Sequence, residues 1–325
     1  MQTFNNIPFT QSFPSSSQLV YGCMGLGGGW NTDPISAEDV KQTHRIINTV
    51  LESGITVFDH ADIYTFGKAE QVFGEVMKAE PSLRDKMLIQ SKCGIRFADD
   101  KGPKRYDFSA DWIQHSVEKS LRHLNVEQLD VLLLHRPDPL MNVQETSATL
   151  NQLVAAGKVK TIGVSNMHSG QIALLQQHLD SQIVANQIEM SLLARDGIEE
   201  GLTTASPAAN NNSFDSHLLS YCQLHNVQIQ AWGSLAQGKI TAPEKATTDQ
   251  QRTLAETVQR IAAEYQSSPE AIALQWLMRL PMGIQPIIGT TNIARIQACA
   301  RAHSIQLSRE HWYELLEAAR GAEVP

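Results

Sequence analysis

The sequence is poor in cysteine and has no long apolar run. Its 325 residues include four cysteines, which lie far apart and form no CxxC pair: Cys23, Cys93, Cys222 and Cys299. This spacing predicts free thiols in a reducing compartment. No apolar run approaches the roughly 18 residues of a membrane span. The first basic residue is Lys41, so the N-terminus lacks the basic region of a signal peptide. We therefore expect a soluble, cytoplasmic protein with no membrane partner.

The sequence is also short of positive charge. It has 26 Lys and Arg against 34 Asp and Glu, which gives a formal net charge of -8. Scattered basic residues in an acidic chain argue against a nucleic-acid partner or an anionic membrane surface, although a local basic pocket remains compatible with them. The sequence predicts no metal site and leaves the oligomeric state open. What it does contain is apolar material, at 42% of residues, which is enough to bury a sizeable core.

Short apolar runs alternate with amphipathic segments along the whole chain. The runs typical of buried strands cover residues 19–24, 55–60, 87–92, 129–135, 159–166, 183–189, 227–232 and 284–289. Helical patterns cover residues 36–54, 109–125, 142–157, 168–179, 213–225, 249–280 (in two pieces split before Pro269) and 293–302. Eight such strand–helix units predict an α/β fold, a (β/α)8 TIM barrel that forms one domain over residues 1–325. The nearly continuous apolar character of the runs agrees with parallel strands covered on both faces.

Two segments stand outside this alternation. Residues 195–215 are rich in Gly, Ala, Ser, Thr and Asn, and they predict a long flexible loop after the sixth strand. Residues 308–320 predict a final helix, across either the bottom or the side of the barrel.

Polar residues gather where the predicted strands end. In a barrel of this kind the chemistry lies at the carboxyl ends of the strands. A single Asp at a strand end is more often a helix or turn cap. A single Lys there is usually an edge residue whose amine reaches solvent, and a single His is more often a core residue whose hydrogen bonds are made within the protein. Together they indicate one pocket, because each unpaired buried charge costs several kcal/mol. In chain order these residues are Asp59, Tyr64, Lys92, His135, Ser165, Asn166, Gln187, Trp232, Ser234, Gly289, Thr290 and Thr291.

Five motifs in this order resemble those of the aldo-keto reductase superfamily: "FDHADIY", "SKCG", "LLLHRPD", "GVSN" and "NQIE". The resemblance extends from Val20 to about Arg301, and "HRPDPL" resembles a bacterial oxidoreductase branch. It implies a (β/α)8 barrel that binds NADP(H) across its C-terminal face. It also implies reduction of a small aldehyde or ketone to an alcohol.

By this resemblance Asp59, Tyr64, Lys92 and His135 match the catalytic tetrad. An unperturbed tyrosine has a pKa of about 10, and a nearby Lys⁺ lowers it. We therefore expect Tyr64 to donate the proton, Lys92 to lower its pKa, Asp59 to hold Lys92, and His135 to contact the substrate oxygen. Two neighbours fall outside the tetrad: we expect His60 to pack against the next strand and Asp62 to cap a loop.

The resemblance also implies a cofactor site. The nicotinamide carboxamide would meet Ser165, Asn166 and Gln187, with Trp232 stacked behind the ring unless it only plugs the barrel. Met24 and Gly25 would lie near the nicotinamide, and Trp30 would line the substrate pocket. The backbone amides of "GSLAQGK", with Gly233, Ser234, Leu235 and Gly238, would wrap the pyrophosphate, and Lys239 would be its charge partner. The helix opened by Gly289, Thr290 and Thr291 favours phosphate, and Arg295 matches the arginine for the 2′-phosphate. Asn292 stands where relatives often have Lys, and Cys299 stands near the position of an adenine-site Asn.

Two other functions remain open from the sequence. The first is a Schiff-base lyase that uses Lys92 as a nucleophile, although it leaves "GVSN", "NQIE" and "GTTNIAR" unexplained. The second is a non-catalytic NADP(H)-binding regulator that keeps most of the tetrad.

Overall fold

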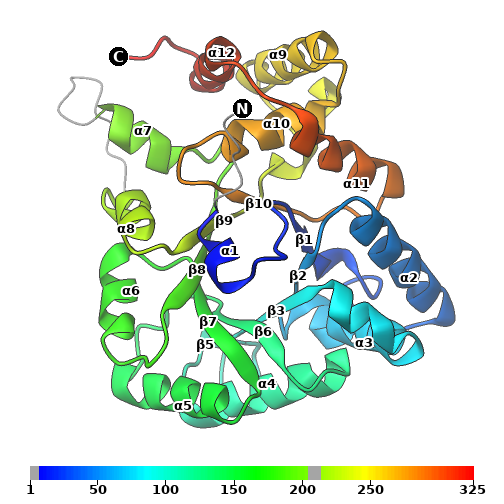
Figure 1. The fold of residues 1–325 in the computed structure, drawn as a ribbon, viewed down its shortest axis with the longest axis vertical. Helices are drawn as coiled ribbons and strands as arrows, with labels where there is room; N and C mark the ends of the chain where they lie inside the picture. Colours follow the sequence, from blue (N-terminus) through cyan, green and yellow to red (C-terminus); the bar gives the residue numbers. More distant parts are fainter. Residues whose placement is uncertain (1–6, 204–213) are drawn as a thin grey trace.

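The computed structural model of the protein describes residues 7–203 and 214–325. Within them, eight parallel strands close into a barrel in the order β1-β10-β9-β8-β7-β6-β3-β2 (Figure 1). The predicted α/β TIM barrel is therefore confirmed. Its strands are β1 (Val20–Gly22), β2 (Val57–Asp59), β3 (Leu88–Cys93), β6 (Leu129–Leu134), β7 (Val159–Ser165), β8 (Ile183–Glu189), β9 (Gln228–Trp232) and β10 (Gln285–Ile288).

A ring of helices surrounds the strands (Figure 1). The α-helices are α1 (Phe9–Ser12), α2 (Ala37–Glu52), α3 (Lys68–Ala79), α4 (Ala110–Leu124), α5 (Val143–Ala155), α6 (Ser169–Gln176), α7 (Asp196–Thr203), α8 (Leu218–Leu224), α9 (Asp249–Glu264), α10 (Pro269–Met278), α11 (Ile293–Ala300) and α12 (Arg309–Arg320). The 3₁₀ turns are η1 (Cys23–Gly25), η2 (Tyr64–Gly67), η3 (Pro81–Lys86), η4 (Ala236–Gly238), η5 (Pro243–Lys245) and η6 (Arg301–Ser304). None of the helices in the two described ranges has the length and apolar character that a membrane crossing requires.

Local sequence signals explain most helix ends. Ser36 and Asp39 form a reciprocal capping box at the start of α2. Pro269 is the first residue of α10 and separates it from α9, which confirms the predicted split. Ser308 caps α12 through the N–H of His311. These caps satisfy helix N–H groups that would otherwise lack partners.

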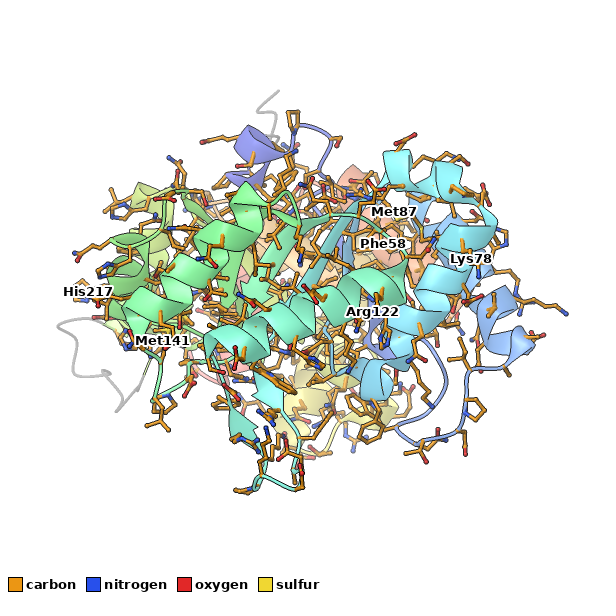
Figure 2. All side chains as sticks on the ribbon, turned by 90° about the horizontal axis from the view of Figure 1, so that it is seen from below. Phe58, Lys78, Met87, Arg122, Met141 and His217 are labelled. Atoms are coloured by element: carbon orange, nitrogen blue, oxygen red, sulfur yellow. The ribbon has the colours of Figure 1, made fainter. Side chains whose placement is uncertain are left out.

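Close packing between α3 and α4 depends on one glycine. A Cβ added at Gly74 would lie 1.8 Å from the carbonyl oxygen of His123, so a larger residue would push the two helices apart. In Figure 2 α3, which carries Lys78, lies beside α4, which carries Arg122. The sequence reading identified α4 but not α3.

The N-terminal segment closes the bottom of the barrel. Ile7, Phe9 and Phe13 are buried and belong to the apolar cluster inside the barrel, together with Val20 and Val57. Figure 1 shows α1 over this end of the barrel. The predicted C-terminal helix is confirmed as α12, and it lies on the side: it packs on α9, and Trp312 stacks on Trp276 of α10 with ring centroids 5.3 Å apart.

The prediction of a flexible loop over residues 195–215 is wrong in its first part. Residues Asp196–Thr203 form α7, because Ile198 and Leu202 pack against the core and Arg195 pairs with Glu199 one turn later. Residues 204–213 lie outside the described residues, as does Ser213 at the predicted start of α8. A short antiparallel hairpin of β4 (Ile95–Arg96) and β5 (Arg105–Tyr106), which the sequence reading did not predict, follows β3.

Candidate active site

Three side chains near the carboxyl ends of β2 and β3 form one hydrogen-bonded line. The ammonium group of Lys92 donates to Asp59 Oδ2 at 2.7 Å, to Tyr64 Oη at 3.0 Å and to the carbonyl oxygen of His60 at 2.8 Å. Its three hydrogens are thereby all used. Asp59 and Lys92 are buried. The strand register explains the meeting, because β2 and β3 are adjacent and parallel.

The charges of Asp59 and Lys92 influence the pKa values of Lys92 and Tyr64. Burial by itself lowers the pKa of Lys92, but the Asp59 carboxylate and the Tyr64 hydroxyl outweigh it, so the pKa of Lys92 is raised and the amine stays protonated. Burial raises the pKa of Tyr64, and Lys92 offsets only part of that rise. The expected effect of Lys92 therefore has the right direction, but the net pKa of Tyr64 lies above its ordinary value. Desolvation outweighs the single cation.

His135 faces the same point from the end of β6. Its ring meets that of Tyr64 edge-on, with centroids 6.0 Å apart. Burial, helped by the positive charges of Lys92 and Arg136, holds the pKa of His135 well below its usual value, so the imidazole is neutral at pH 7. Its Nδ1 has no hydrogen-bond partner in the described part of the chain. The four predicted catalytic residues are thus brought together.

Two neighbours outside the tetrad are buried beside it. The backbone N–H of His60 donates to the carbonyl oxygen of Gln90 on β3, its ring packs edge-on against Phe73 of α3 with centroids 4.5 Å apart, and burial lowers its pKa to about 3. Asp62 caps no helix or turn through Oδ1, which has no partner among the described residues. It is buried beside Glu70, and burial followed by the charge of Glu70 raises its pKa to about 7. Asp62 was named from the sequence, but the second carboxylate beside it, Glu70, was not predicted.

The predicted carboxamide ligands lie together at the ends of β7, β8 and β9. Asn166, in a left-handed conformation at φ 58°, donates to Ser165 Oγ at 2.8 Å and accepts from the indole Nε1 of Trp232 at 3.2 Å. Trp232 is held in place by this bond and by the guanidinium of Arg136, 5.6 Å from its ring. Gln187 donates both amide hydrogens inward, to Asp59 and Gln230. Only its Oε1 remains to accept a bond from a ligand.

The predicted pyrophosphate loop is conformationally strained. Ala236 and Gln237 have φ values of 46° and 58°, and Gly233 and Gly238 flank them with φ 67° and 86°. Left-handed non-glycine residues cost on the order of 1–3 kcal/mol each and gather at functional sites. The side chains of Ser234 and Leu235 are used within the protein: the hydroxyl of Ser234 donates to the carbonyl oxygen of Ile287, and Leu235 packs against the core. The prediction for these two residues concerns their backbone amides and stays a prediction.

Two cations meet above Gly238. A Cβ added there would lie 3.3 Å from Lys245 Nζ and 3.5 Å from an Arg295 guanidinium nitrogen. Lys245 was missed by the sequence reading, although it follows "GSLAQGK" closely; Lys239 lies nearby in the chain and is half-buried. Arg295 also contacts Glu270 at 3.4 Å. A glycine floor beneath two cations fits a phosphate group, and it is the feature of this face that best accommodates NADP(H).

The remaining predicted cofactor residues line the junction of β1 and β10. Met24 is exposed, and a Cβ added at Gly25 would touch Thr291 at 3.1 Å. The hydroxyl of Tyr21 donates to the carbonyl oxygen of Thr290, and Gly289 is exposed. Asn292 caps α11 by accepting from the N–H of Arg295, which gives this position a use other than phosphate contact. Cys299 is fully buried, so it cannot contact an adenine directly; all four cysteines are buried and free, as predicted.

Aromatic rings form one wall near the tetrad. Trp30 meets Phe66 edge-on at 5.4 Å between centroids, and Phe66 lies 5.2 Å from Phe97. Trp30 and Phe66 are about half exposed, and Phe66 has a left-handed φ of 59° directly after Tyr64 and Thr65. The sequence reading named only Trp30. The arrangement can hold an organic carbonyl compound by its apolar part while Tyr64 reaches the oxygen.

The chain as a whole is similar to known proteins. The pattern of the Aldo/keto reductase family matches residues 18–320. The chain is 38% identical to 6-dehydroglucose reductase of Agrobacterium fabrum, over 95% of this chain and 96% of that protein. It is 33% identical to oxidoreductase YdhF of Escherichia coli, over 96% of each. A crystal structure of an aldo/keto reductase from Klebsiella pneumoniae in complex with NADP and acetate is 25% identical, covers 92% of this chain and 90% of that one, and gives a TM-score of 0.71.

Proposed function

The chain belongs to the aldo/keto reductase family and is an oxidoreductase, and we propose that it uses NADP(H) to reduce an aldehyde or ketone to an alcohol, with Tyr64 as the proton donor. One observation carries the proposal: the unbroken line from Asp59 through Lys92 to Tyr64 Oη. It puts a donatable proton at the carboxyl ends of the strands, the face on which TIM-barrel enzymes act.

The residues of the chain divide the work of reduction. NADPH, when bound, supplies the hydride. Tyr64 Oη gives its proton to the carbonyl oxygen as that oxygen gains negative charge. Lys92, 3.0 Å away, stabilises the resulting phenolate, and Asp59 keeps Lys92 protonated and fixed. The neutral imidazole of His135 orients the carbonyl oxygen by a hydrogen bond without adding charge.

The cofactor residues support NADP(H) in particular. Arg295 and Lys245 lie above Gly238 and offer two positive charges to a 2′-phosphate. Ser165, Asn166 and the free oxygen of Gln187 would hold the carboxamide, and Trp232 would support the nicotinamide ring. The Klebsiella relative crystallised with NADP gives this assignment independent support.

We propose 6-dehydroglucose as the first substrate to test. The Agrobacterium relative carries that activity in its name, and a second relative of the same name, from Novosphingobium aromaticivorans, is 34% identical. Both are bacterial, in agreement with the expectation from "HRPDPL". The wall of Trp30, Phe66 and Phe97 offers apolar faces against which the C–H groups of a sugar can pack.

Two other functions have less support. A lyase needs a neutral, nucleophilic Lys92, whereas this amine is protonated and donates to three acceptors. A purely regulatory NADP(H)-binding barrel has no use for a complete proton-donor line. Borohydride treatment with substrate would trap a Lys92 adduct only in a lyase.

The proposal is tested by Tyr64→Phe, measured as NADPH oxidation with 6-dehydroglucose and with a panel of aldehydes, ketones and quinones. General acid catalysis contributes about 10²- to 10⁴-fold, so kcat should fall by that factor while NADPH binding, followed by fluorescence quenching, is retained.

The control is Tyr265→Phe, which removes a hydroxyl that contacts Ser308 and His311 away from the tetrad. It should leave kcat unchanged. A Tyr64→Phe protein with wild-type kcat would remove Tyr64 from the role of proton donor. A wild-type protein that binds NADPH but reduces no carbonyl compound would favour the regulator.

A further inference from the structure

Four buried glutamines form a chain of amides through the middle of the barrel. They come from four strands: Gln90 on β3, Gln187 on β8, Gln230 on β9 and Gln285 on β10, each at most 1% exposed. Barrel interiors are usually filled by branched apolar side chains. Burying four amides there is favourable only if their hydrogen bonds are made, which indicates that the chain of bonds has a purpose.

The direction of every amide in the chain is fixed from its lower end. Gln285 donates from Nε2 to the carbonyl oxygen of Ser17 at 2.7 Å and to Ser16 Oγ at 3.1 Å. A carbonyl oxygen can only accept, so Gln285 must turn its own oxygen toward Gln230. Gln230 Nε2 donates to Gln285 Oε1 at 3.1 Å and to Gln90 Oε1 at 3.2 Å.

The upper end of the chain is the catalytic carboxylate. Gln230 Oε1 accepts from Gln90 Nε2 at 3.0 Å and from Gln187 Nε2 at 2.9 Å. The second amide hydrogen of each then points at Asp59 Oδ1, at 2.7 Å from Gln90 and 2.8 Å from Gln187. Asp59 Oδ2 is left for Lys92. Both carboxylate oxygens are therefore occupied, each from a defined side.

We propose that Gln230 is a positioning residue for carbonyl reduction: it orients Gln90 and Gln187 so that both donate to Asp59 and hold Asp59 Oδ2 on Lys92. The inference rests on the proposed function, since it assumes that Asp59 and Lys92 serve Tyr64. Without the acceptor oxygen of Gln230, either amide can turn over and present its oxygen to Asp59. That contact is repulsive, and it shifts the carboxylate and with it the ammonium that holds Tyr64.

The chain supplies a matched control on the same strand. Gln228 lies two residues before Gln230, is 0% exposed, and points into the same barrel. Its amide accepts from the N–H of Phe9 and donates to the carbonyl oxygen of Gly283. It therefore contacts the N-terminal segment that closes the barrel, but none of its described hydrogen bonds leads to Asp59.

The experiment compares Gln230→Met with Gln228→Met, since methionine keeps the length of glutamine and removes its hydrogen bonds. Weakening a hydrogen bond to a charged group corresponds to about 10- to 100-fold in rate. Gln230→Met should lower kcat by that factor and leave the KM of the carbonyl substrate within about twofold. Gln228→Met should lower the melting temperature by at least as much as Gln230→Met does, and it should leave kcat unchanged.

A second measurement shows whether Gln230 acts through Asp59. Gln230→Met is combined with Asp59→Asn, and hydride transfer is followed as a single turnover with enzyme in excess. In that background Gln230→Met should have no further effect. An equal loss of kcat in both methionine variants, or an unchanged kcat in Gln230→Met, would overturn the inference. A wild-type enzyme that reduces no carbonyl compound would instead overturn the proposed function.

Discussion

The two faces of β3 hold two buried carboxylate sites that were built differently. Lys92 points into the barrel and meets Asp59 at 2.7 Å, whereas the preceding Ser91 points outward and donates to Glu70 Oε1 at 2.6 Å. Asp59, Asp62 and Glu70 are all 3% exposed or less. The inner site thus has a cation and two amides, and the outer site has a hydroxyl donor.

The difference shows that the partner, rather than burial, decides the charge of a buried acid. The inner carboxylate has every oxygen occupied and keeps Lys92 protonated. In the outer pair, Asp62 Oδ1 and Glu70 Oε2 have no hydrogen-bond partner among the described residues, and His123 Nδ1 lies 3.9 Å from Glu70 Oε2. Burial raises the pKa of Glu70, and that of Asp62 rises to about 7. The inner site is suited to catalysis at neutral pH, and the outer one stores a proton.

The largest effect is expected for Lys92→Met, which removes the cation from the inner site and leaves Asp59 without its ion-pair partner. Removing one partner of a buried ion pair destabilises a protein by about 3–5 kcal/mol, and NADPH-dependent reduction should be abolished. Urea unfolding and a turnover assay measure the two effects.

Lys119→Met is the matched control for Lys92→Met. Lys119 is a half-buried cation whose charge acts on the outer pair, and its loss should leave turnover unchanged and cost under about 1 kcal/mol. Wild-type turnover in Lys92→Met would contradict the proposed proton line. A reduced-substrate adduct on Lys92 of the wild-type protein, trapped by borohydride, would restore the lyase.

A second prediction sharpens the comparison through pH. The pKa of Asp62 is about 7 in the folded protein against 3.8 for an ordinary Asp, so the folded state binds this proton more tightly. The resulting stabilisation is complete below about pH 4 and is lost as the pH rises through about 7. A shift of this size corresponds to at most about 4 kcal/mol.

The test is the difference in unfolding free energy between the wild type and Asp62→Asn, measured by urea unfolding from pH 4 to pH 8. The asparagine cannot titrate, so the wild type should lose stability relative to the variant as the pH rises. Asp85→Asn, at an exposed position, should run parallel to the wild type. Parallel curves for Asp62→Asn as well would show that the outer carboxylate is ionised throughout this range.

The smallest effect concerns a third carboxylate, Glu270, which has a cation as its partner but is less buried than the inner and outer sites. Arg295 and Glu270 meet at 3.4 Å and are partly exposed, at 35% and 14%, so this pair contributes little stability and leaves the guanidinium available. NADPH should therefore bind more tightly than NADH. Arg295→Leu should cost NADPH about tenfold or more in affinity and leave NADH unaffected, as measured by fluorescence quenching. Equal affinities in the wild type would point to Asn292, which caps α11 instead of offering a cation.

Much of the site could be predicted from the sequence, because polar residues that end apolar strands meet at one face of a parallel barrel. Asp59, Lys92 and His135 each close an apolar run, and parallel strands bring such ends together. Of the glutamine chain, only Gln187 followed this rule, because the other three members lie within strands assumed to be apolar inside. Its signal was the alternation in "VQIQAW", which sends Gln228 and Gln230 to one face.

Other features depend on contacts that no local pattern encodes. Lys245 and Arg295 both lie near Gly238, which ends a loop that bends through several left-handed residues from Gly233 onward. The N-terminal segment has no regular periodicity, and its Phe9 and Phe13 have a partner only once the barrel has closed. The helix α7 was hidden by its glycines and polar residues, since its support comes from packing and ion pairs rather than from propensity.

The N-terminal segment that closes the bottom of the barrel can pack only late during synthesis. Ile7, Phe9 and Phe13 are made long before β10, yet β1 pairs with β10, and Ser17 receives its bond only after Gln285 has been made. Contacts between such distant segments form late, because the entropy of closing the intervening chain must first be offset. During synthesis this apolar segment therefore lacks its partners until β10 has been made. Apolar surface that is exposed in this way is prone to aggregation until it is buried.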